Sequence, residues 1–190
     1  MIEAGQIKKS IFYISGRNGD FTTGLGEYLA TKTEELNGLS LSDKFLSEEF
    51  ETQLEVISEL LSKARAKQSI IVANSYGAYL LLHAILANRI GLSKLILISP
   101  ILGATYSGNR FFKPPFSRRL HALMGETANG LPRDTIVIWG AEDDSVDQVG
   151  LQRLTSRCAD TQIIKINEQK HNIDKRILAE ALNLILDEFT

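Results

Sequence analysis

The sequence has a single cysteine, Cys158, among its 190 residues. One thiol excludes an internal disulfide and every metal site built from several cysteines. Long hydrophobic runs are also missing, since the longest, such as residues 80–87, fall far short of the ~20 residues that cross a bilayer. The first ten residues lack the apolar core of a signal peptide. We therefore expect a soluble, cytoplasmic protein that does not span a membrane.

An excess of positive charge is absent as well. Lysine and arginine number 21 against 23 aspartates and glutamates, which gives a net charge of −2. Nucleic-acid binders carry a basic surface, so this balance argues against a nucleic-acid partner. The hydrophobic content of 44% and charged content of 23% are those of an ordinary globular protein. We expect a single domain over residues 1–190.

Five short apolar runs rich in β-branched residues alternate with segments of helical periodicity. The runs cover residues 10–14, 69–73, 94–98, 135–139 and 162–166, and residues 38–41 are a weaker sixth candidate. Apolar runs without polar alternation are typical of parallel strands buried on both faces. Helical patterns lie between them, including residues 76–89 and an apolar stripe over 174–189. The alternation predicts an α/β fold with a mostly parallel sheet of about five or six strands.

The most informative segment is Ala73-Asn74-Ser75-Tyr76-Gly77, between an apolar run and a long apolar helix. A nucleophile on a tight strand-to-helix turn needs small residues two positions before and after it. The turn exposes the hydroxyl, and the N-terminus of the helix favours a developing negative charge. Ser75 is therefore a candidate nucleophile.

This segment resembles the nucleophile elbow of the α/β-hydrolase superfamily, normally G-x-S-x-G, with Ala73 in place of the first glycine. The resemblance extends from residue 11 to the C-terminus. It implies a three-layer α/β/α sandwich, a minimal α/β-hydrolase fold of the small esterase or lipase kind. It also implies catalysis by a serine, an acid and a histidine in that order along the chain.

A serine hydroxyl needs a base, and the sequence has three histidines. His83 lies eight residues past Ser75 in the same helix, roughly 12 Å along it, and cannot reach the serine. His121 lies in an irregular segment. His171 follows the last strand-like run, which is the position of the catalytic histidine in the family. We expect His171 to be the base.

The acid is expected after the run 135–139. The segment from Gly140 to Asp147 resembles the family's G-x-x-D-x-x-V stretch, with Asp143 as the acid. Glu142, Asp144 and Asp147 remain alternatives, because a shift of the loop would exchange one for another. Asp147 also stands at the expected start of a helix, where an acid is favoured by the helix dipole.

Two further parts of a site follow from the resemblance. The Gly-rich turn after the first strand looks like the family's oxyanion loop. The resemblance implies that the backbone N–H groups of Arg17 and Tyr76 hold the oxyanion. A residue one position before or after Arg17 is an alternative donor from the loop. Residues 103–132 stand where relatives insert a cap. The aromatic rings of this cap-like excursion, Phe111, Phe112 and Phe116, would line a substrate pocket or pack the loop onto the core.

The sequence thus predicts a serine hydrolase that cleaves an ester, thioester or lactone through an acyl-enzyme formed by Ser75, His171 and Asp143. No metal or organic cofactor is expected, and the partner is a small ester-like substrate. Two alternatives stay open: an acyltransferase that uses the same residues, and a non-catalytic hydrolase-like protein that binds a ligand or a protein. The sequence leaves the oligomeric state open.

Overall fold

Six parallel strands form the central sheet. The computed structural model describes residues 10–107, 110–126, 131–132, 134–157 and 161–187. The strand order is β2-β1-β3-β4-β7-β8, and every neighbouring pair is parallel. These strands are β1 (Ser10–Arg17), β2 (Glu35–Leu41), β3 (Ile70–Asn74), β4 (Lys94–Ile98), β7 (Asp134–Gly140) and β8 (Gln162–Ile166). The predicted parallel sheet of five or six strands is confirmed.

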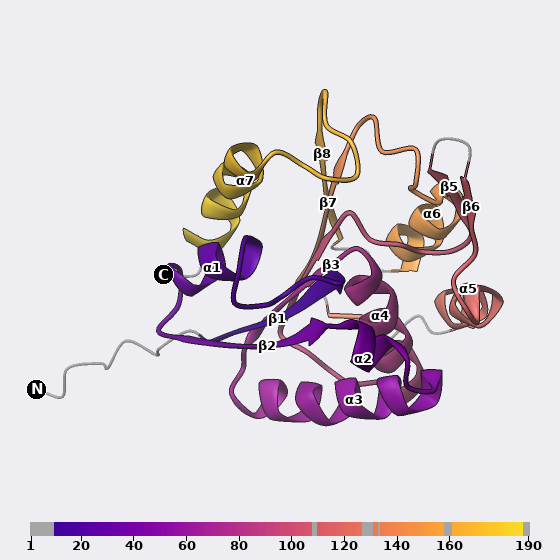
Figure 1. Cartoon of the computed structure of the whole chain (residues 1–190), viewed down its shortest axis with the longest axis horizontal. Coiled ribbons are helices and arrows are strands. Elements are labelled where there is room, and N and C mark those ends of the chain that lie inside the picture. Colours follow the sequence, from indigo (N-terminus) through magenta and orange to yellow (C-terminus); the bar gives the residue numbers. More distant parts are fainter. Residues whose placement is uncertain (1–9, 108–109, 127–130, 133, 158–160, 188–190) are drawn as a thin grey trace, which may run out of the picture.

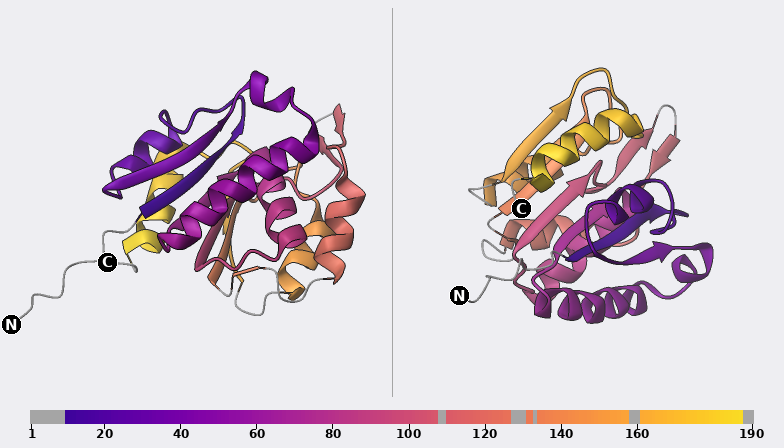
Figure 2. Two further views of the ribbon diagram at one scale, coloured as in Figure 1. Left: turned by 90° about the horizontal axis from the view of Figure 1, so that it is seen from below. Right: turned by 90° about the vertical axis from the view of Figure 1, so that its left-hand side faces the viewer.

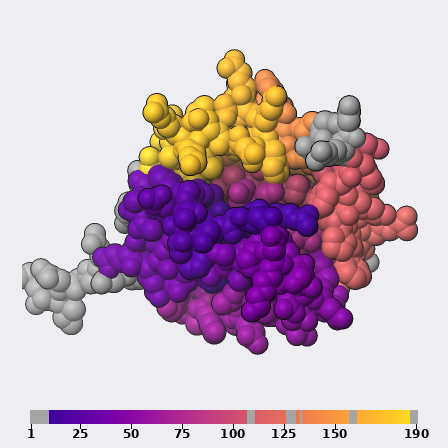
Figure 3. All heavy atoms as spheres, viewed as in Figure 1, coloured from indigo at the N-terminus to yellow at the C-terminus, as the bar shows by residue number. Residues whose placement is uncertain are grey.

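Helices cover both faces of this sheet (Figures 1 and 2). One face is covered by α1 (Leu25–Ala30) and α7 (Lys175–Asp187), and the other by α3 (Phe50–Ala66), α4 (Tyr76–Asn88), α5 (Ser117–Glu126) and α6 (Gln148–Arg157). A short helix, α2 (Asp43–Leu46), precedes α3. In the space-filling view the indigo N-terminal strands lie between yellow α7 and purple α3 (Figure 3). The predicted three-layer α/β/α sandwich is confirmed.

The core is most complete around β3 and α4. Successive residues of β3 enter opposite layers, with Ile71 and Ala73 facing α4 and Val72 facing the α1 and α7 side. Helix α4 is buried on all sides over residues 76–86. Each fully buried Leu or Ile contributes about 1.5–3 kcal/mol of hydrophobic free energy. The turn between β3 and α4 therefore sits on the most firmly packed part of the molecule.

The edges of the sheet differ from the expectation of strands buried on both faces. Strand β8 is an edge strand, and Ile163 in it is 45% exposed. Strand β2, the other edge, is longer than the weak candidate at 38–41 and is largely exposed or half-buried. In α7, Ile177 faces solvent, although the periodicity placed it on the buried stripe. Because β2 and β8 each have a neighbouring strand on one side only, the residues along their outer edges are exposed to solvent. Cys158 lies outside the described residues.

Segment 103–132 contains local structure that the sequence pattern did not indicate. Strands β5 (Thr105–Ser107) and β6 (Arg110–Phe112) form an antiparallel hairpin, which is followed by α5. Helix α5 packs against α4 and α6 (Figure 1). The hairpin is separate from the six-stranded sheet. Its role as a cap stays a prediction.

The direction of winding changes between β1 and β3. From β1 the chain passes to β2 on one side, and then returns across β1 to β3 and the remaining strands. Ligand sites in open α/β sheets lie outside the carboxyl ends of the strands at such a switch point. The loop after β1 and the turn after β3, which contains Ser75, both emerge there.

Candidate active site

Ser75 occupies a strained turn between β3 and α4. Its backbone has φ 51° and ψ −116°, a conformation that residues other than glycine rarely adopt. The Ser75 N–H donates to the Ile98 carbonyl at 2.9 Å, which ties the turn to β4. Strain of this kind persists only where the surroundings hold it, and it is common at functional sites.

The small residues around Ser75 are required by close packing. Ala73 is fully buried. A Cβ added to Gly77 would lie 2.2 Å from the Ser15 carbonyl oxygen and 2.9 Å from a methyl carbon of Ile14. Any larger residue at position 77 would push α4 away from β1. Glycine at position 77 is therefore required for α4 to pack closely on β1.

His171 lies beside Ser75 in the loop between β8 and α7. Its Nε2 is 2.8 Å from the Ser75 Oγ. The His171 carbonyl accepts a hydrogen bond from the Ser99 Oγ at 2.8 Å, which fixes the backbone of the loop. The imidazole is 30% exposed, so solvent reaches the ring. The expected serine–histidine contact is present.

Asp143 completes a chain of three side chains. Its Oδ2 is 3.0 Å from the Nδ1 of His171, and its carboxylate is fully buried. Gly140 turns the chain off β7 where the histidine loop passes closely, since a Cβ there would lie 2.2 Å from the Gln169 carbonyl oxygen. Burial alone would raise the pKa of Asp143, but hydrogen bonds from His171 and Ser145 hold the pKa below its ordinary value. Asp143 is thus ionised at neutral pH.

Ser145 is a part of this cluster that the sequence analysis missed. Its backbone N–H donates to the Asp143 Oδ1 at 2.9 Å, and its hydroxyl donates to the same oxygen. The Ser145 Oγ also lies 2.8 Å from the His171 Nδ1. An aspartate followed two residues later by serine commonly forms such a local turn, and that spacing was the available signal.

These contacts fix the protonation of the histidine ring. The Ser145 hydroxyl gives its proton to Asp143, so its oxygen accepts from His171. A hydrogen on Nδ1 satisfies both the Asp143 Oδ2 and the Ser145 Oγ. Nε2 then keeps its lone pair toward Ser75. The hydrogen-bond network therefore assigns the tautomer with the hydrogen on Nδ1.

The competing acids are placed elsewhere. Asp147 caps α6, because its Oδ1 accepts from the N–H groups of Val149 and Gly150 at 3.1 Å each. Its Oδ2 is 2.7 Å from the Nε2 of His121. Glu142 and Asp144 are exposed, whereas the Asp143 carboxylate faces the histidine. The expected structural position of Asp147 at a helix start is confirmed.

His83, the third histidine, is fully buried inside α4. Its ring makes edge contacts with Phe50 and Tyr79, with centroids 5.0 and 4.8 Å apart. Neither ring nitrogen has a hydrogen-bond partner among the residues that the structure describes. Burial lowers the pKa of His83 to about 3, with a smaller contribution from the charge of Arg119. His83 is therefore a neutral core residue.

The proposed oxyanion donors lie at the switch point. Tyr76 begins α4, and the first N–H groups of a helix have no intrahelical partner. The Asn18 N–H donates to the Leu41 carbonyl on β2 at 2.9 Å. Arg17 is the last residue of β1 and pairs with Leu41 of β2. The binding of an oxyanion by its N–H stays a prediction. Gly16 packs on the serine, since a Cβ there would lie 3.4 Å from the Ser75 Cβ.

Solved structures share this architecture. Est1E from Butyrivibrio proteoclasticus matches over 98% of this chain and 90% of its own, with a TM-score of 0.69 and 13% identity. A monoacylglycerol lipase from Paleococcus ferrophilus matches over 95% of both chains, with a TM-score of 0.69 and 10% identity. The mouse alpha/beta hydrolase domain-containing protein 10 matches over 95% and 90%, with a TM-score of 0.69 and 14% identity. The chain has the α/β-hydrolase fold. No protein-family model and no curated protein matches the sequence.

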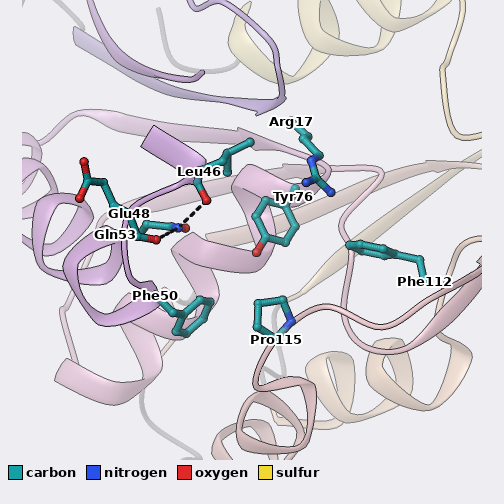
Figure 4. A pocket seen from close by; sticks show the side chains of 8 residues that line it. All are labelled: Arg17, Leu46, Glu48, Phe50, Gln53, Tyr76, Phe112 and Pro115. Carbon is teal, nitrogen blue, oxygen red and sulfur yellow. Dashed lines mark hydrogen bonds between the residues drawn. The ribbon is translucent and has the colours of Figure 1, made fainter. Parts of the chain in front are cut away.

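Within this α/β-hydrolase fold, a cavity of about 310 Å³ lies against Tyr76 (Figure 4). One wall comes from the segment between α2 and the first turn of α3, which the sequence analysis did not implicate. The opposite wall comes from the cap-like excursion and the oxyanion loop. The lining residues are Arg17, Leu46, Glu48, Phe50, Gln53, Tyr76, Phe112 and Pro115.

The three phenylalanines of the excursion are separated. Phe112 lines the cavity against Tyr76, and the two ring centroids are 6.4 Å apart. Phe111, on the other side of β6, lines a second cavity of about 250 Å³ with His121. Phe116 packs on Phe50, with centroids 4.8 Å apart. Phe112 therefore packs beside the residue that directly follows Ser75, and a role in substrate binding stays a prediction for all three.

In the ranges that the structure describes, no helix has the length and apolarity needed to cross a membrane. The described His, Cys, Asp and Glu side chains form no cluster of three or more that could hold a metal ion.

Proposed function

We propose that this protein is a serine hydrolase that cleaves an ester-like bond. The observation that carries the proposal is the linear arrangement of Ser75, His171 and Asp143, with the serine Oγ 2.8 Å from one ring nitrogen and the carboxylate 3.0 Å from the other. Nucleophile, base and orienting acid in hydrogen-bond contact define this class of catalyst on any fold. The strained turn and the switch point support the same interpretation.

The first half of the reaction forms an acyl-enzyme. His171 Nε2 takes the proton of Ser75 as the serine Oγ bonds to the substrate carbonyl carbon. The carbonyl oxygen gains negative charge, which the N–H groups of Tyr76 and Arg17 stabilise. His171 then gives the proton to the leaving oxygen as the carbon–oxygen bond breaks. The ionised Asp143 stabilises the imidazolium throughout.

Water completes the cycle. His171 takes a proton from a water molecule, whose oxygen attacks the acyl carbon. The bond to Ser75 breaks, the acid leaves, and the serine recovers its proton from the histidine. The exposed edge of the imidazole gives water access to the ring.

The names of the structural neighbours fit an ester-like substrate. One is a monoacylglycerol lipase, and Est1E has also been solved with ferulic acid bound. At 10–15% identity these names support a class of reaction for this chain and leave the substrate open. An ester, a thioester or a lactone satisfies the proposed mechanism.

Hydrolysis of a short-chain ester panel by the wild type and by Ser75→Ala tests the proposal. The wild type should turn over at least one acetate or butyrate ester, and Ser75→Ala should lose about 10⁴-fold or more in kcat. Matched circular dichroism spectra would show that the variant is folded. Equal hydrolysis by both proteins would refute the role of Ser75. Added alcohols, with product analysis, separate hydrolysis from acyl transfer.

A further inference from the structure

The cavity beside the serine turn combines apolar walls with one cation, Arg17, which lines the cavity and is exposed to solvent. Phe50, Phe112 and Pro115 supply apolar surface, and the Tyr76 ring stacks on Tyr79 behind it. Figure 4 shows the Arg17 guanidinium extending toward Tyr76 at the upper side of the cavity. Glu48, the other charged lining residue, points its carboxylate away from the rest of the group (Figure 4).

Arg17 has no ion-pair partner among the described residues. The described salt bridges join other residues: Lys67 with Glu35, Lys94 with Asp134, Arg119 with Glu51, His121 with Asp147, and His171 with Asp143. Asp20, which is close in sequence, instead accepts hydrogen bonds from Thr22 and Ser40. The guanidinium is therefore available to a ligand, with five N–H donors in a planar fork that matches a carboxylate.

The charge of Arg17 reaches the cavity surface. Burial raises the pKa of the Tyr76 hydroxyl, and the nearby positive charge of Arg17 partly offsets that rise. No described residue hydrogen-bonds this hydroxyl, which in Figure 4 points into the cavity. In Figure 4 the hydroxyl lies at the end of the ring that points away from Arg17, so the guanidinium and the phenol offer donors at different points of the cavity. Gln53 does not add donors, because its Nε2 is engaged by the carbonyls of Leu46 and Glu48.

The cation is also close to the proposed reacting centre. Arg17 directly follows Gly16, whose Cα packs against Ser75, and Tyr76 directly follows the serine. Ser75 and His171 do not line the cavity themselves, but two of its lining residues, Arg17 and Tyr76, adjoin the serine turn. The ligand of Arg17 and the scissile bond can belong to one small molecule.

We propose that Arg17 is a specificity-determining residue and that the substrate is an ester whose acyl part carries a carboxylate, such as a half-ester of a dicarboxylic acid. The apolar walls hold the methylene chain, and the guanidinium of Arg17 binds the free carboxylate. This inference rests on the proposed function and adds a substrate class to it. Arg17 then has two separate roles: its backbone N–H binds the oxyanion, and its side chain binds the free carboxylate.

Two isosteric substrates test the inference. The first is monomethyl adipate, and the second is the methyl ester in which a neutral nitro group replaces the free carboxylate. The wild type should favour the carboxylate by about two- to fivefold in kcat/KM, the range expected for an exposed ion pair. About 0.5 M sodium chloride should reduce this preference, since salt screens exposed charges. Arg17→Met should bring the ratio close to one.

Arg118→Met is the matched control. Arg118 lines the second cavity, so its loss should leave the ratio unchanged. A ratio measured on one preparation does not depend on how much of that preparation is folded, which protects the test against partial unfolding of a variant. A wild-type ratio of one or less, or an unchanged ratio in Arg17→Met, would overturn the inference.

A binding measurement separates this inference from the proposed function. Ser75→Ala should bind monomethyl adipate more tightly than the nitro ester in ligand-observed NMR titrations, and the difference should disappear in Ser75→Ala combined with Arg17→Met. If the wild type cleaves both esters without preference, the specificity inference alone fails. If the wild type cleaves neither these two esters nor any ester of the short-chain panel but the binding difference is present, the proposed function fails and Arg17 remains an anion-binding residue.

Discussion

The molecule contains two histidine–aspartate pairs of nearly equal geometry. His171 and Asp143 are 3.0 Å apart, and His121 and Asp147 are 2.7 Å apart. The first pair places the other nitrogen of its histidine on Ser75. In the second pair, the aspartate caps α6 and the pair packs against Gly103, where a Cβ would lie 2.3 Å from a carboxylate oxygen. A histidine–aspartate contact therefore carries no reaction by itself, and the nucleophile on the far side of the ring makes the difference.

The largest expected difference concerns the two histidines. His171→Gln should lower kcat for a short ester by about 10⁴-fold or more, because Ser75 loses its base. His121→Gln should leave kcat nearly unchanged, since glutamine can still donate to Asp147. Steady-state kinetics on both variants make the comparison. A large loss in His121→Gln with a small one in His171→Gln would exchange the roles of the pairs.

The two aspartates should separate in a different way. Asp143→Asn should lower kcat by up to about 10⁴-fold while the melting temperature changes little, because the imidazole loses its orienting charge. Asp147→Ala should keep kcat unchanged. Its free energy of unfolding should fall by about 0.5–2 kcal/mol, since α6 loses its N-cap. Kinetics and thermal unfolding of both variants are required. A rate loss confined to Asp147→Ala would move the acid to that residue.

The pKa of His83, whose ring has no hydrogen-bond partner among the described residues, should make the stability of the protein depend on pH. Its pKa of about 3 in the folded protein lies below the value of 6.5 for a free side chain. The unfolded chain therefore binds an additional proton between these values, so stability falls as the pH drops from 6.5 toward 3. His83→Leu should raise stability by about 1–3 kcal/mol by removing unsatisfied polar atoms.

Denaturant unfolding over a range of pH measures this effect. The gain in His83→Leu over the wild type should grow below pH 6.5, which is the ordinary value for histidine. A variant that is less stable than the wild type, with the same dependence on pH, would show that the ring has partners in solution.

The smallest expected effect belongs to Ser145. Ser145→Ala should lower kcat by about tenfold, the equivalent of one hydrogen bond to a charged group. Ser145→Thr keeps the hydroxyl and should recover most of the rate. Recovery in threonine distinguishes positioning of Asp143 and His171 from a general loss of packing. Equal activity in the alanine variant would show that the backbone N–H of residue 145 and the His171 ring hold the Asp143 carboxylate without the hydroxyl.

The sequence indicated those features that depend on local pattern. Buried central strands such as β4 coincide with the predicted run, because strands covered on both faces need continuous apolar residues. Ser75 was found because the turn requires small residues at fixed spacing. Asp143 was preferred to Asp147 on spacing, and only the structure shows that Asp147 instead contacts His121.

The features that sequence did not indicate depend on contacts between distant residues. Ser99 fixes His171 from 72 positions away, and Ser145 reaches the same ring from 26. The spacing of Asp143 and Ser145 indicates a local turn, but no pattern in the sequence indicates that either serine contacts His171. The cavity wall at residues 46–53 is brought to Tyr76 only by the packing of α3 on α4. The first half of edge strand β2 was not predicted, because an exposed strand has little hydrophobic periodicity.

Covalent labelling of the folded protein tests the central claim most directly. A fluorophosphonate probe reacts with a serine that a neighbouring base activates, and mass spectrometry of the digested protein locates the adduct. We predict a single adduct on Ser75 in the wild type, none in Ser75→Ala, and much slower labelling in His171→Gln than in His121→Gln. An adduct on another serine such as Ser145, or no adduct on the folded wild type, would contradict the account.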